Sequence, residues 1–408
     1  MFVYMLTTKG KFVLLLFFTL CLGPNVIDYI GIAQNNYYTT LLIVSFVFAY
    51  GYRRFVDKHI IYLIVFTIFY GVFKIYTDTG EGTRAIVLCA LAPGVLFSAY
   101  PPIKKNSLSN IRIWRALALL LLVFYLVETG VAIYERLTWK LVFGWAETHS
   151  VGIDVTAIEF RSTALLGHPL ANALIVSTIM SFFLVSPIKS KYKYSLWFWG
   201  LLAVMCFNAR GAIIGNVAVL GLYLFYTFLF DKRLSYKKKC RLFFLVLLLS
   251  GAGLYLFVSG YVGGRLMESG VNDGSSQVRI DIWSVFTKYD VGSFLIGVNS
   301  HDLDMIMYSL GLYATENYWL DWIFRLGVFF LVPYVFLYAG VLKHEYSGYS
   351  KVDFLITFVA FLGISSTNNS LSSSILPTFV FLLCIRVFKK ETFSYIIPTK
   401  YLDRNRIV

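Results

Sequence analysis

Charged residues are scarce in this chain, and their scarcity excludes a water-soluble fold. Of its 408 residues, 14% are charged and 58% are hydrophobic, whereas soluble domains carry roughly 25% charged residues. Apolar runs of about 18 residues or more recur from end to end, and each is long enough to cross the hydrocarbon layer as a helix. Because a backbone in lipid must satisfy its own hydrogen bonds, we expect an all-α protein, a polytopic membrane helical bundle.

The sequence is also poor in cysteine and in the motifs of soluble enzymes. Its five cysteines lie in or beside apolar runs without paired metal-ligand spacing, so we expect neither disulfides nor a metal site. It has no phosphate loop, dinucleotide fingerprint or catalytic triad motif, and we expect no cofactor. The first apolar stretch lacks a small-residue cleavage site, so we interpret it as a membrane span and not as a signal peptide.

Lysine and arginine together exceed aspartate and glutamate, 36 to 22, but their positions argue against a nucleic acid partner. Most of the basic residues stand in short loops between apolar runs, a distribution that membrane topology explains. We therefore expect a lipid bilayer, and no nucleic acid, around the chain. We predict about twelve transmembrane helices. Their boundaries are residues 12–32, 38–52, 60–76, 84–100, 113–133, 168–187, 195–208, 211–230, 242–260, 317–341, 354–366 and 374–388.

The loops between these spans alternate in charge. One set is rich in lysine and arginine and the other is acidic and polar. By the positive-inside rule, the basic set and both termini lie in the cytoplasm. We therefore predict one multi-pass transmembrane domain, 1–408, in the bacterial cytoplasmic (inner) membrane. It has a smaller periplasmic loop at 134–167 and a large extracytoplasmic loop at 261–316.

The large outer loop has the features of a functional segment. It contains two helix-like stretches, at 276–289 and 303–313, and loops of this length in a compact protein are usually functional. Its apolar side chains need either the membrane surface or the helical bundle to pack against. These side chains are Val278, Ile282, Trp283, Val285, Phe286 and Leu295.

Arginines at the outer ends of the spans are the most informative residues, because the positive-inside rule gives them no topological reason to be there. Arg210 stands between two apolar runs, where the chain has barely room to turn. An ionisable group at membrane depth is costly unless it faces a cavity or a partner, so Arg210 is a functional candidate. The alternative is an interfacial arginine that reaches to water or pairs with a structural acid. The other outer arginines are Arg161, Arg265 and Arg279.

Guanidinium groups suit phosphates, since each is permanently charged and offers a planar fork of donors. Two or three of them around an outward cavity fit a pyrophosphate whose lipid tail lies in the bilayer. Arg161 precedes a span, and Arg279 lies one helical turn before Trp283. For Arg161, Arg265 and Arg279 a solvated or interfacial charge is the alternative interpretation.

Candidates for a catalytic base lie in the large loop and at its end. Glu316 stands at the entrance of a span, where partial removal from water raises the pKa of a carboxyl towards the range of a general base. The alternative is a helix N-terminal acid that the helix dipole stabilises. His301 is a second candidate base. His168, which precedes Pro169 at a span start, is interpreted as a helix cap or as a contact to the bound anion.

In their order and spacing these motifs resemble the O-antigen polymerase and O-antigen ligase superfamily of bacterial polysaccharide assembly. The resemblance covers the whole architecture, with its large periplasmic loop late in the chain. Residues 161–172 match the family's arginine, glycine and proline before a span, and residues 208–212 are similar to its arginine-containing turn. The run from Arg279 through Trp283 to Gly297 resembles the family's pattern of Arg, Trp and Gly.

One position departs from the family's ligases, which place a histidine at the end of the large loop and a glycine further on. Here Glu316 and Asn317 stand in that place, with Gly327 in register. The missing histidine favours a polymerase over a ligase. It also leaves open whether Glu316 is the base.

The resemblance implies a metal-independent membrane glycosyltransferase of the GT-C type, with no cofactor. It would join undecaprenyl-pyrophosphate-linked oligosaccharide repeat units at the periplasmic face, with inversion at the anomeric carbon. A chain-length regulator and a flippase of the same pathway are the expected protein partners. Glu316 or His301 would take the proton of the acceptor hydroxyl. The residues expected to bind the pyrophosphate or the rest of the substrate are Arg161, Arg210, Arg279, Arg265, His168 and Asn317.

Two other functions stay open. The first is an O-antigen ligase, which transfers the glycan to lipid A-core. Loss of a polymerase leaves a single capped repeat unit, whereas loss of a ligase leaves free lipid-linked polymer. The second is a flippase or transporter of the same pathway. Transporters are commonly built from internal repeats with a site at the membrane midplane, whereas the polar candidates here cluster in one outer loop and its flanks.

Overall fold

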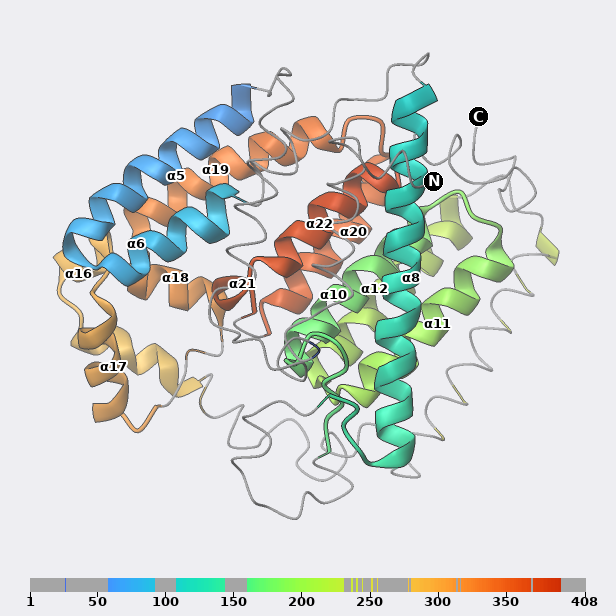
Figure 1. The fold of residues 1–408 in the computed structure, drawn as a ribbon, viewed down its shortest axis with the longest axis horizontal. Helices are drawn as coiled ribbons and strands as arrows, with labels where there is room; N and C mark the ends of the chain where they lie inside the picture. Colours follow the sequence, from blue (N-terminus) through green and yellow to red (C-terminus); the bar gives the residue numbers. More distant parts are fainter. Residues whose placement is uncertain are drawn as a thin grey trace.

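The part of the chain that the computed structural model describes is helical (Figure 1). It comprises residues 58–91, 108–143, 160–230, 280–312, 317–367 and 370–389, and single residues at 26, 236, 237, 240, 244, 251, 255, 278 and 315. No β-strand occurs among these residues, so the prediction of an all-α fold is confirmed for them. Apart from single positions, the predicted spans 12–32, 38–52 and 242–260 lie outside the described residues, and the count of about twelve spans stays a prediction.

Four described helices are long and apolar enough to cross a membrane. Three of them coincide with predicted spans, and bulky apolar side chains on their outer faces are exposed, as lipid-facing helices require. Two shorter apolar helices, α10 (Pro169–Val185) and α22 (Leu376–Val387), lie among them. The four long helices are α5 (Lys58–Thr77), residues Trp114–Thr138 of α8 (Leu108–Thr138), α12 (Arg210–Phe230) and α19 (Val328–Glu345).

Helix α10 forms the centre of the bundle. Every side chain from Ala171 to Val185 is buried, as expected for a helix that is apolar on all faces. It is packed against α11 (Ser190–Cys206), α12, α20 (Lys351–Ser365) and α22, which surround it in Figure 1. Polar side chains of α10 also bond neighbouring helices; Ser177 Oγ, for example, accepts a hydrogen bond of 2.6 Å from Asn216 Nδ2 on α12.

The predicted span 317–341 is wrong as one continuous helix. The structure divides it into α18 (Tyr318–Leu326) and α19, with Gly327 between them at a φ of 76°. The chain breaks there because the backbone of Gly327 lies directly against that of Gly297: a Cβ at Gly327 would lie 2.6 Å from the Gly297 nitrogen. Only glycine accepts both this contact and this dihedral angle without strain.

The described part of the large loop packs on α18. It forms η3 (Ile282–Lys288), a 3₁₀ helix, then α16 (Val291–Ile296) and α17 (Ser300–Ser309). The predicted stretches 276–289 and 303–313 overlap η3 and α17, but the sequence analysis missed α16. Ile282, Val285 and Leu303 are fully buried in a small apolar cluster with residues of α18. The loop therefore packs on the bundle, and Trp283 stays 60% exposed.

Near the amino-terminal end of the described chain, α5 turns back through α6 (Thr79–Ala85) into the π-helix η2 (Ile86–Leu91). The remainder of the predicted span 84–100 lies outside the described residues. Helix α5 packs along α19 and contacts the large loop. Tyr70 donates its hydroxyl proton to the carbonyl of Ile296 at 3.2 Å, and Lys74 Nζ donates to the carbonyl of Val298 at 3.4 Å. These contacts hold the large loop against α5.

The two ends of the bundle differ in charge. At one end, which we call the basic end, α10 and α22 both finish, and Phe183 packs on Phe388 with ring centroids 5.4 Å apart. The α19 terminus joins them through the Arg386–Glu345 ion pair of 2.8 Å. Lysines gather at the turns of this end, at Lys189, Lys191, Lys343, Lys351 and Lys389. The opposite end holds four of the residues that the sequence singled out, Arg161, His168, Arg210 and Asn317.

Candidate functional site

A buried segment, residues 160–167, lies across the opposite end of the bundle and is called the strap below. It precedes α10 and is tied to α8 along its length. Ser162 Oγ donates to the carbonyl of Ala132 at 2.7 Å, and Arg136 Nη1 donates to the carbonyl of Phe160 at 3.1 Å. These bonds hold residues that belong to no regular helix against the end of a predicted span.

Two carboxylates of α8 accept the backbone N–H groups of the strap. Glu135 Oε2 accepts from Thr163 and Ala164 at 2.8 and 3.0 Å, and Glu128 Oε2 accepts from Leu165 at 3.1 Å. Ala164 adopts a left-handed φ of 41°, which turns successive N–H groups towards α8. The sequence analysis overlooked both glutamates, although two acids inside an apolar run are a functional signal by the same reasoning that selected Arg210.

The strap brings Arg161 next to the start of α12. The N–H of Ser162 donates to the carbonyl of Cys206 at 3.1 Å, so the residue after Arg161 touches the last turn of α11. Four positions after Cys206, Arg210 begins α12, following a left-handed turn at Asn208 with a φ of 54°. Both arginine side chains are half-buried. The two arginines, distant in the sequence, therefore lie on adjoining segments.

The end of α20 completes this site. A Cβ at Gly211 would lie 2.5 Å from Thr367 Oγ1, so the start of α12 is in close contact with the residue that follows α20. From the other side, Trp319 Nε1 donates to Ser366 Oγ at 3.0 Å. Asn317 caps α18 there, and its Oδ1 accepts from the N–H of Trp319 at 2.9 Å. The start of α18 and the start of α12 thus meet at the same end of α20.

His168 is the N-cap of α10. Its Nδ1 accepts from the N–H of Ala171 at 3.4 Å, which satisfies one of the free donors of the first helical turn. An imidazole that accepts a hydrogen bond through Nδ1 is neutral. The sequence left a cap and an anion contact open; the geometry matches the cap, and the neutral ring adds no positive charge to the site.

The remaining predicted residues are placed differently. His301 is exposed on α17, which Figure 1 shows at the left edge of the molecule, away from α10 and α12. The structure therefore does not bring His301 to Arg161 and Arg210. Arg265, Arg279 and Glu316 lie outside the described residues. Among the described residues, no group of three His, Cys, Asp or Glu side chains is placed to hold a metal ion.

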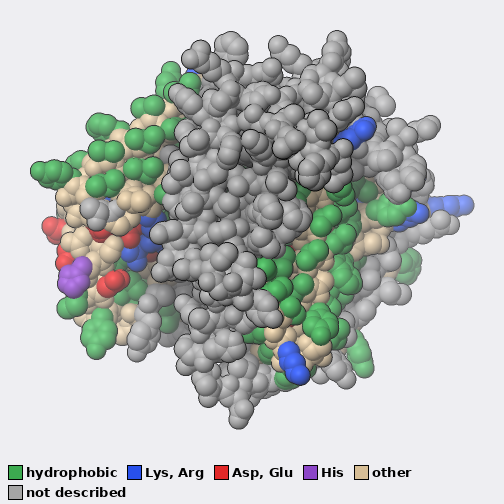
Figure 2. Space-filling model, viewed as in Figure 1, with side chains coloured by type: hydrophobic (Ala, Val, Ile, Leu, Met, Phe, Trp, Pro, Cys, Tyr) green, Lys and Arg blue, Asp and Glu red, His purple; other side chains and the backbone are tan. Residues whose placement is uncertain are grey.

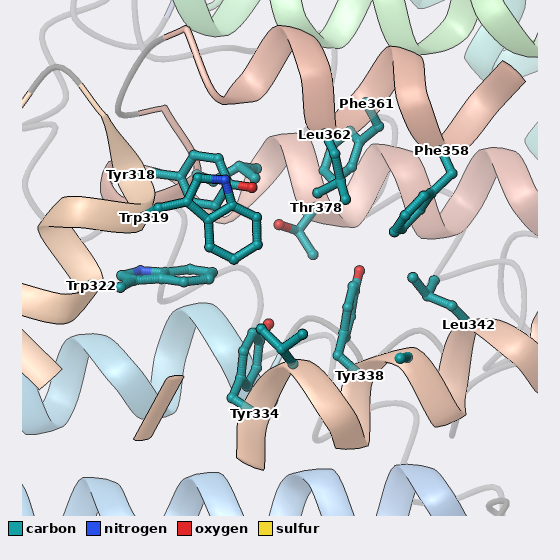
Figure 3. Close-up of a pocket in the computed structure, with 13 residues that line it drawn as sticks. Tyr318, Trp319, Trp322, Tyr334, Tyr338, Leu342, Phe358, Phe361, Leu362 and Thr378 are labelled. Atoms are coloured by element: carbon teal, nitrogen blue, oxygen red, sulfur yellow. The ribbon is translucent and has the colours of Figure 1, made fainter. Parts of the chain in front are cut away.

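An apolar pocket runs from this site between α18, α19 and α20 (Figure 3). Its volume is about 80 Å³, which exceeds the 10 to 15 Å³ that one water needs by roughly fivefold. Trp319, whose indole bonds Ser366, lies at one end of it and Leu342 at the other. The Tyr338 hydroxyl is buried and has no hydrogen-bond partner among the described residues. On the outer side the pocket is bordered by the exposed residues Val335 and Ala339.

A network of charged residues, also missed by the sequence analysis, lies beside α18. Arg325 bridges Glu81 on α6 and Asp321 on its own helix, at 2.7 and 2.8 Å. Arg84 lies 3.7 Å from Asp321. Burial raises the pKa of Asp321, but the two guanidinium groups outweigh it and hold the pKa below its usual value. Figure 2 shows acidic, basic and histidine side chains gathered at the left of the molecule, below the hydrophobic surface of α5.

We interpret the role of this network as structural. Its carboxylates are paired with arginines and buried, whereas Arg161 forms no ion pair with any described residue. Arg161, which is half-buried on the strap, is therefore the better candidate for binding an external anion. Comparisons with known proteins add no assignment: no protein-family model matches this chain, and no curated protein matches it.

Proposed function

We propose that this chain is a polysaccharide polymerase of the O-antigen polymerase type, embedded in the inner membrane. It joins oligosaccharide repeat units linked to undecaprenyl pyrophosphate, at the periplasmic face. It belongs to the GT-C type in architecture and works with a chain-length regulator and a flippase of the same pathway. The observation that carries the proposal is that the segments bearing Arg161 and Arg210 adjoin at the end of the bundle opposite to the lysines.

The two arginines suit a pyrophosphate. Each guanidinium is permanently charged and offers a planar fork of N–H donors to phosphate oxygens. The bond between Ser162 and Cys206 places the two arginine-bearing segments side by side. Arg279, from the large loop, is proposed as a third contact, and Arg265 as a further one. Asn317 and His168 are proposed as further contacts to the substrate.

The charge difference between the ends supports a periplasmic site. Short loops rich in lysine stay in the cytoplasm, and Lys189, Lys191 and Lys343 mark the basic end. The end with the strap is then periplasmic. Both chain termini are proposed to be cytoplasmic.

The pocket of Figure 3 supports a lipid-linked substrate. It begins at Trp319, which bonds the same α20 terminus that Gly211 touches. Its wall on one side is α19, a helix apolar enough to cross a membrane. The first isoprene units of the carrier lipid would lie in this pocket while the pyrophosphate contacts the arginines.

The proposed reaction transfers the growing glycan. The hydroxyl oxygen of the acceptor attacks the anomeric carbon of the donor from the side opposite to the pyrophosphate. The bond from that carbon to the pyrophosphate oxygen breaks, and its electron pair stays on the leaving group. Arg161 and Arg210 offset the charge that develops there. The acceptor proton passes to the carboxylate of Glu316, and His301 is the less favoured base because the structure places it apart from the arginines.

The test is a complementation assay in a strain that lacks its polymerase. Arg161→Ala and Arg210→Ala should each abolish long-chain polysaccharide and leave a single repeat unit on the lipid, at normal abundance of the protein in the membrane. The matched control is Lys191→Ala, which removes an exposed cation at the basic end and should leave chain length unchanged. Wild-type chain length in Arg210→Ala would remove this arginine from the site and with it the main support for the proposal.

A further inference from the structure

Every residue of the strap is buried except one. Phe160 and the residues from Ser162 to Gly167 are buried, whereas Arg161 is half-exposed. The residues on both sides of Arg161 are hydrogen-bonded to neighbouring helices. The carbonyl of Phe160 accepts from α8, and Ser162 bonds both α8 and the last turn of α11. Arg161 is thus the one residue of the strap whose side chain is accessible at the end of the bundle.

The face of α8 that holds the strap is specialised for this task. Glu128, Ala132 and Glu135 are spaced at four and three residues, which places them on one side of the helix. All three are fully buried, and all three accept hydrogen bonds from the strap. Burying two carboxylates in an apolar helix is costly unless hydrogen bonds compensate them. The N–H groups of the strap provide this compensation for Glu135 and for Oε2 of Glu128, whereas Oε1 of Glu128 has no hydrogen-bond partner among the described residues.

Glu135 also binds the beginning of the loop that joins α8 to α10. Its second oxygen, Oε1, accepts from the N–H of Val142 at 2.9 Å. One carboxylate therefore ties together the segment that leaves α8 and the segment that enters α10. The N–H groups of the strap donate to these carboxylates, so the two glutamates hold the strap through its backbone.

We propose that Glu135, assisted by Glu128, is a positioning residue that fixes the strap so that Arg161 stands beside Arg210 to bind the substrate's phosphates. This role rests on the proposed function. Neither glutamate touches the substrate, and their effect passes through Arg161 alone. Removing Glu135 should therefore shorten the polymer only in a protein that retains Arg161.

The test combines a structural and a functional measurement on the full-length protein in membranes. In Glu135→Ala, the amides of Thr163 and Ala164 should lose at least about tenfold in protection from hydrogen exchange, because each loses a hydrogen bond to a charged acceptor. Polymer length should fall to that of Arg161→Ala. In the double variant the loss should be no greater than in Arg161→Ala alone, since coupled residues are not additive.

Two further variants separate positioning from general destabilisation. Glu135→Gln keeps an oxygen for Thr163 and Ala164 and loses only the bond to Val142, so it should retain most of the chain length. Glu345→Gln, which alters a buried ion pair at the basic end, should leave chain length and strap protection unchanged. Equal losses in all three glutamate variants would overturn the positioning role.

The two proposals fail in different ways. Unchanged exchange in Glu135→Ala, or a further loss in the double variant when Arg161→Ala alone is only partly impaired, overturns the positioning role and leaves the proposed function standing. Wild-type chain length in Arg161→Ala overturns the use of this arginine in the proposed function, and the positioning role goes with it.

Discussion

Arg325 donates from Nη1 to Oε1 of Glu81 at 2.7 Å, although the two residues are 244 positions apart in the chain. The same guanidinium donates from Nε to Asp321 at 2.8 Å. It thereby joins α6, which follows the first described span, to α18, which precedes the last long one. Both carboxylates are buried, so removing one partner leaves an uncompensated buried charge, which costs far more than breaking a surface ion pair.

Glu81→Ala should destabilise the protein, because it leaves Arg325 with one carboxylate in place of two. Removing one partner of a buried ion pair costs about 3 to 5 kcal/mol, and we expect the lower figure, about 3 kcal/mol, since Asp321 remains. Thermal unfolding in detergent measures the effect. Asp304→Ala, which removes an exposed carboxylate from α17, is the control and should change the free energy of unfolding by less than about 0.5 kcal/mol. Equal unfolding temperatures for both variants would show that the network contributes little.

The contact between Asp78 and Ser300 should depend on pH. Asp78 Oδ2 accepts from the N–H and the Oγ of Ser300 at 2.5 and 2.9 Å. Burial raises the pKa of Asp78, but the hydrogen bonds from Ser300, Glu81 and Gly80 outweigh it and lower the pKa below its usual value. A carboxyl with a lowered folded pKa stabilises the fold above its unfolded pKa of about 3.9, and this stabilisation disappears as the pH falls through the lowered value.

Docking of α17 should therefore be constant from neutral pH to about pH 4 and weaken below it. Hydrogen exchange of α17, corrected for the intrinsic pH dependence of exchange, measures the docking. Asp78→Asn should already be loosened at neutral pH and should show little further change on acidification. If wild type and Asp78→Asn follow the same pH profile, another group controls the docking.

The close approach of Gly297 and Gly327 should tolerate no side chain. Both have positive φ, 80° and 76°, and a Cβ on Gly297 would lie 2.6 Å from the carbonyl carbon of Arg325. Gly327→Ala should lower the free energy of unfolding by more than about 1 kcal/mol and release the large loop. Gly363→Ala is the matched control in α20, because a Cβ there meets nothing within 4 Å, and it should be neutral or slightly stabilising. Thermal unfolding of the two variants measures this difference in stability.

Blocking the apolar pocket should shorten the polysaccharide if the carrier lipid enters it. Ala339→Trp places a large side chain at the outer border of the pocket, and we expect at least about a tenfold drop in long-chain product from an obstruction that costs about 1.4 kcal/mol or more. Val332→Trp, on an exposed position of the same helix outside the pocket lining, is the control. Equal chain lengths in the two variants would exclude this pocket as the lipid channel.

Local sequence patterns predicted the helices well. The apolar runs at 60–76, 113–133 and 211–230 correspond to α5, α8 and α12, because helix formation in an apolar run depends on neighbours within a few residues. The break at Gly327 was missed. Its cause is the backbone of Gly297, a contact between distant segments that no local window contains.

The sequence by itself determined that the described part of this chain consists of apolar helices. Hydropathy and charge are properties of the individual residue, so they can be evaluated without knowing which residues it contacts. Only the tertiary structure decided which charged residues meet. Arg161 lies beside the start of α12 because Glu135, Glu128 and Cys206 bind the strap, whereas His301 is held elsewhere by the packing of α17. Such pairings depend on how distant helices pack, since a hydrogen bond requires its partners within about 3 Å.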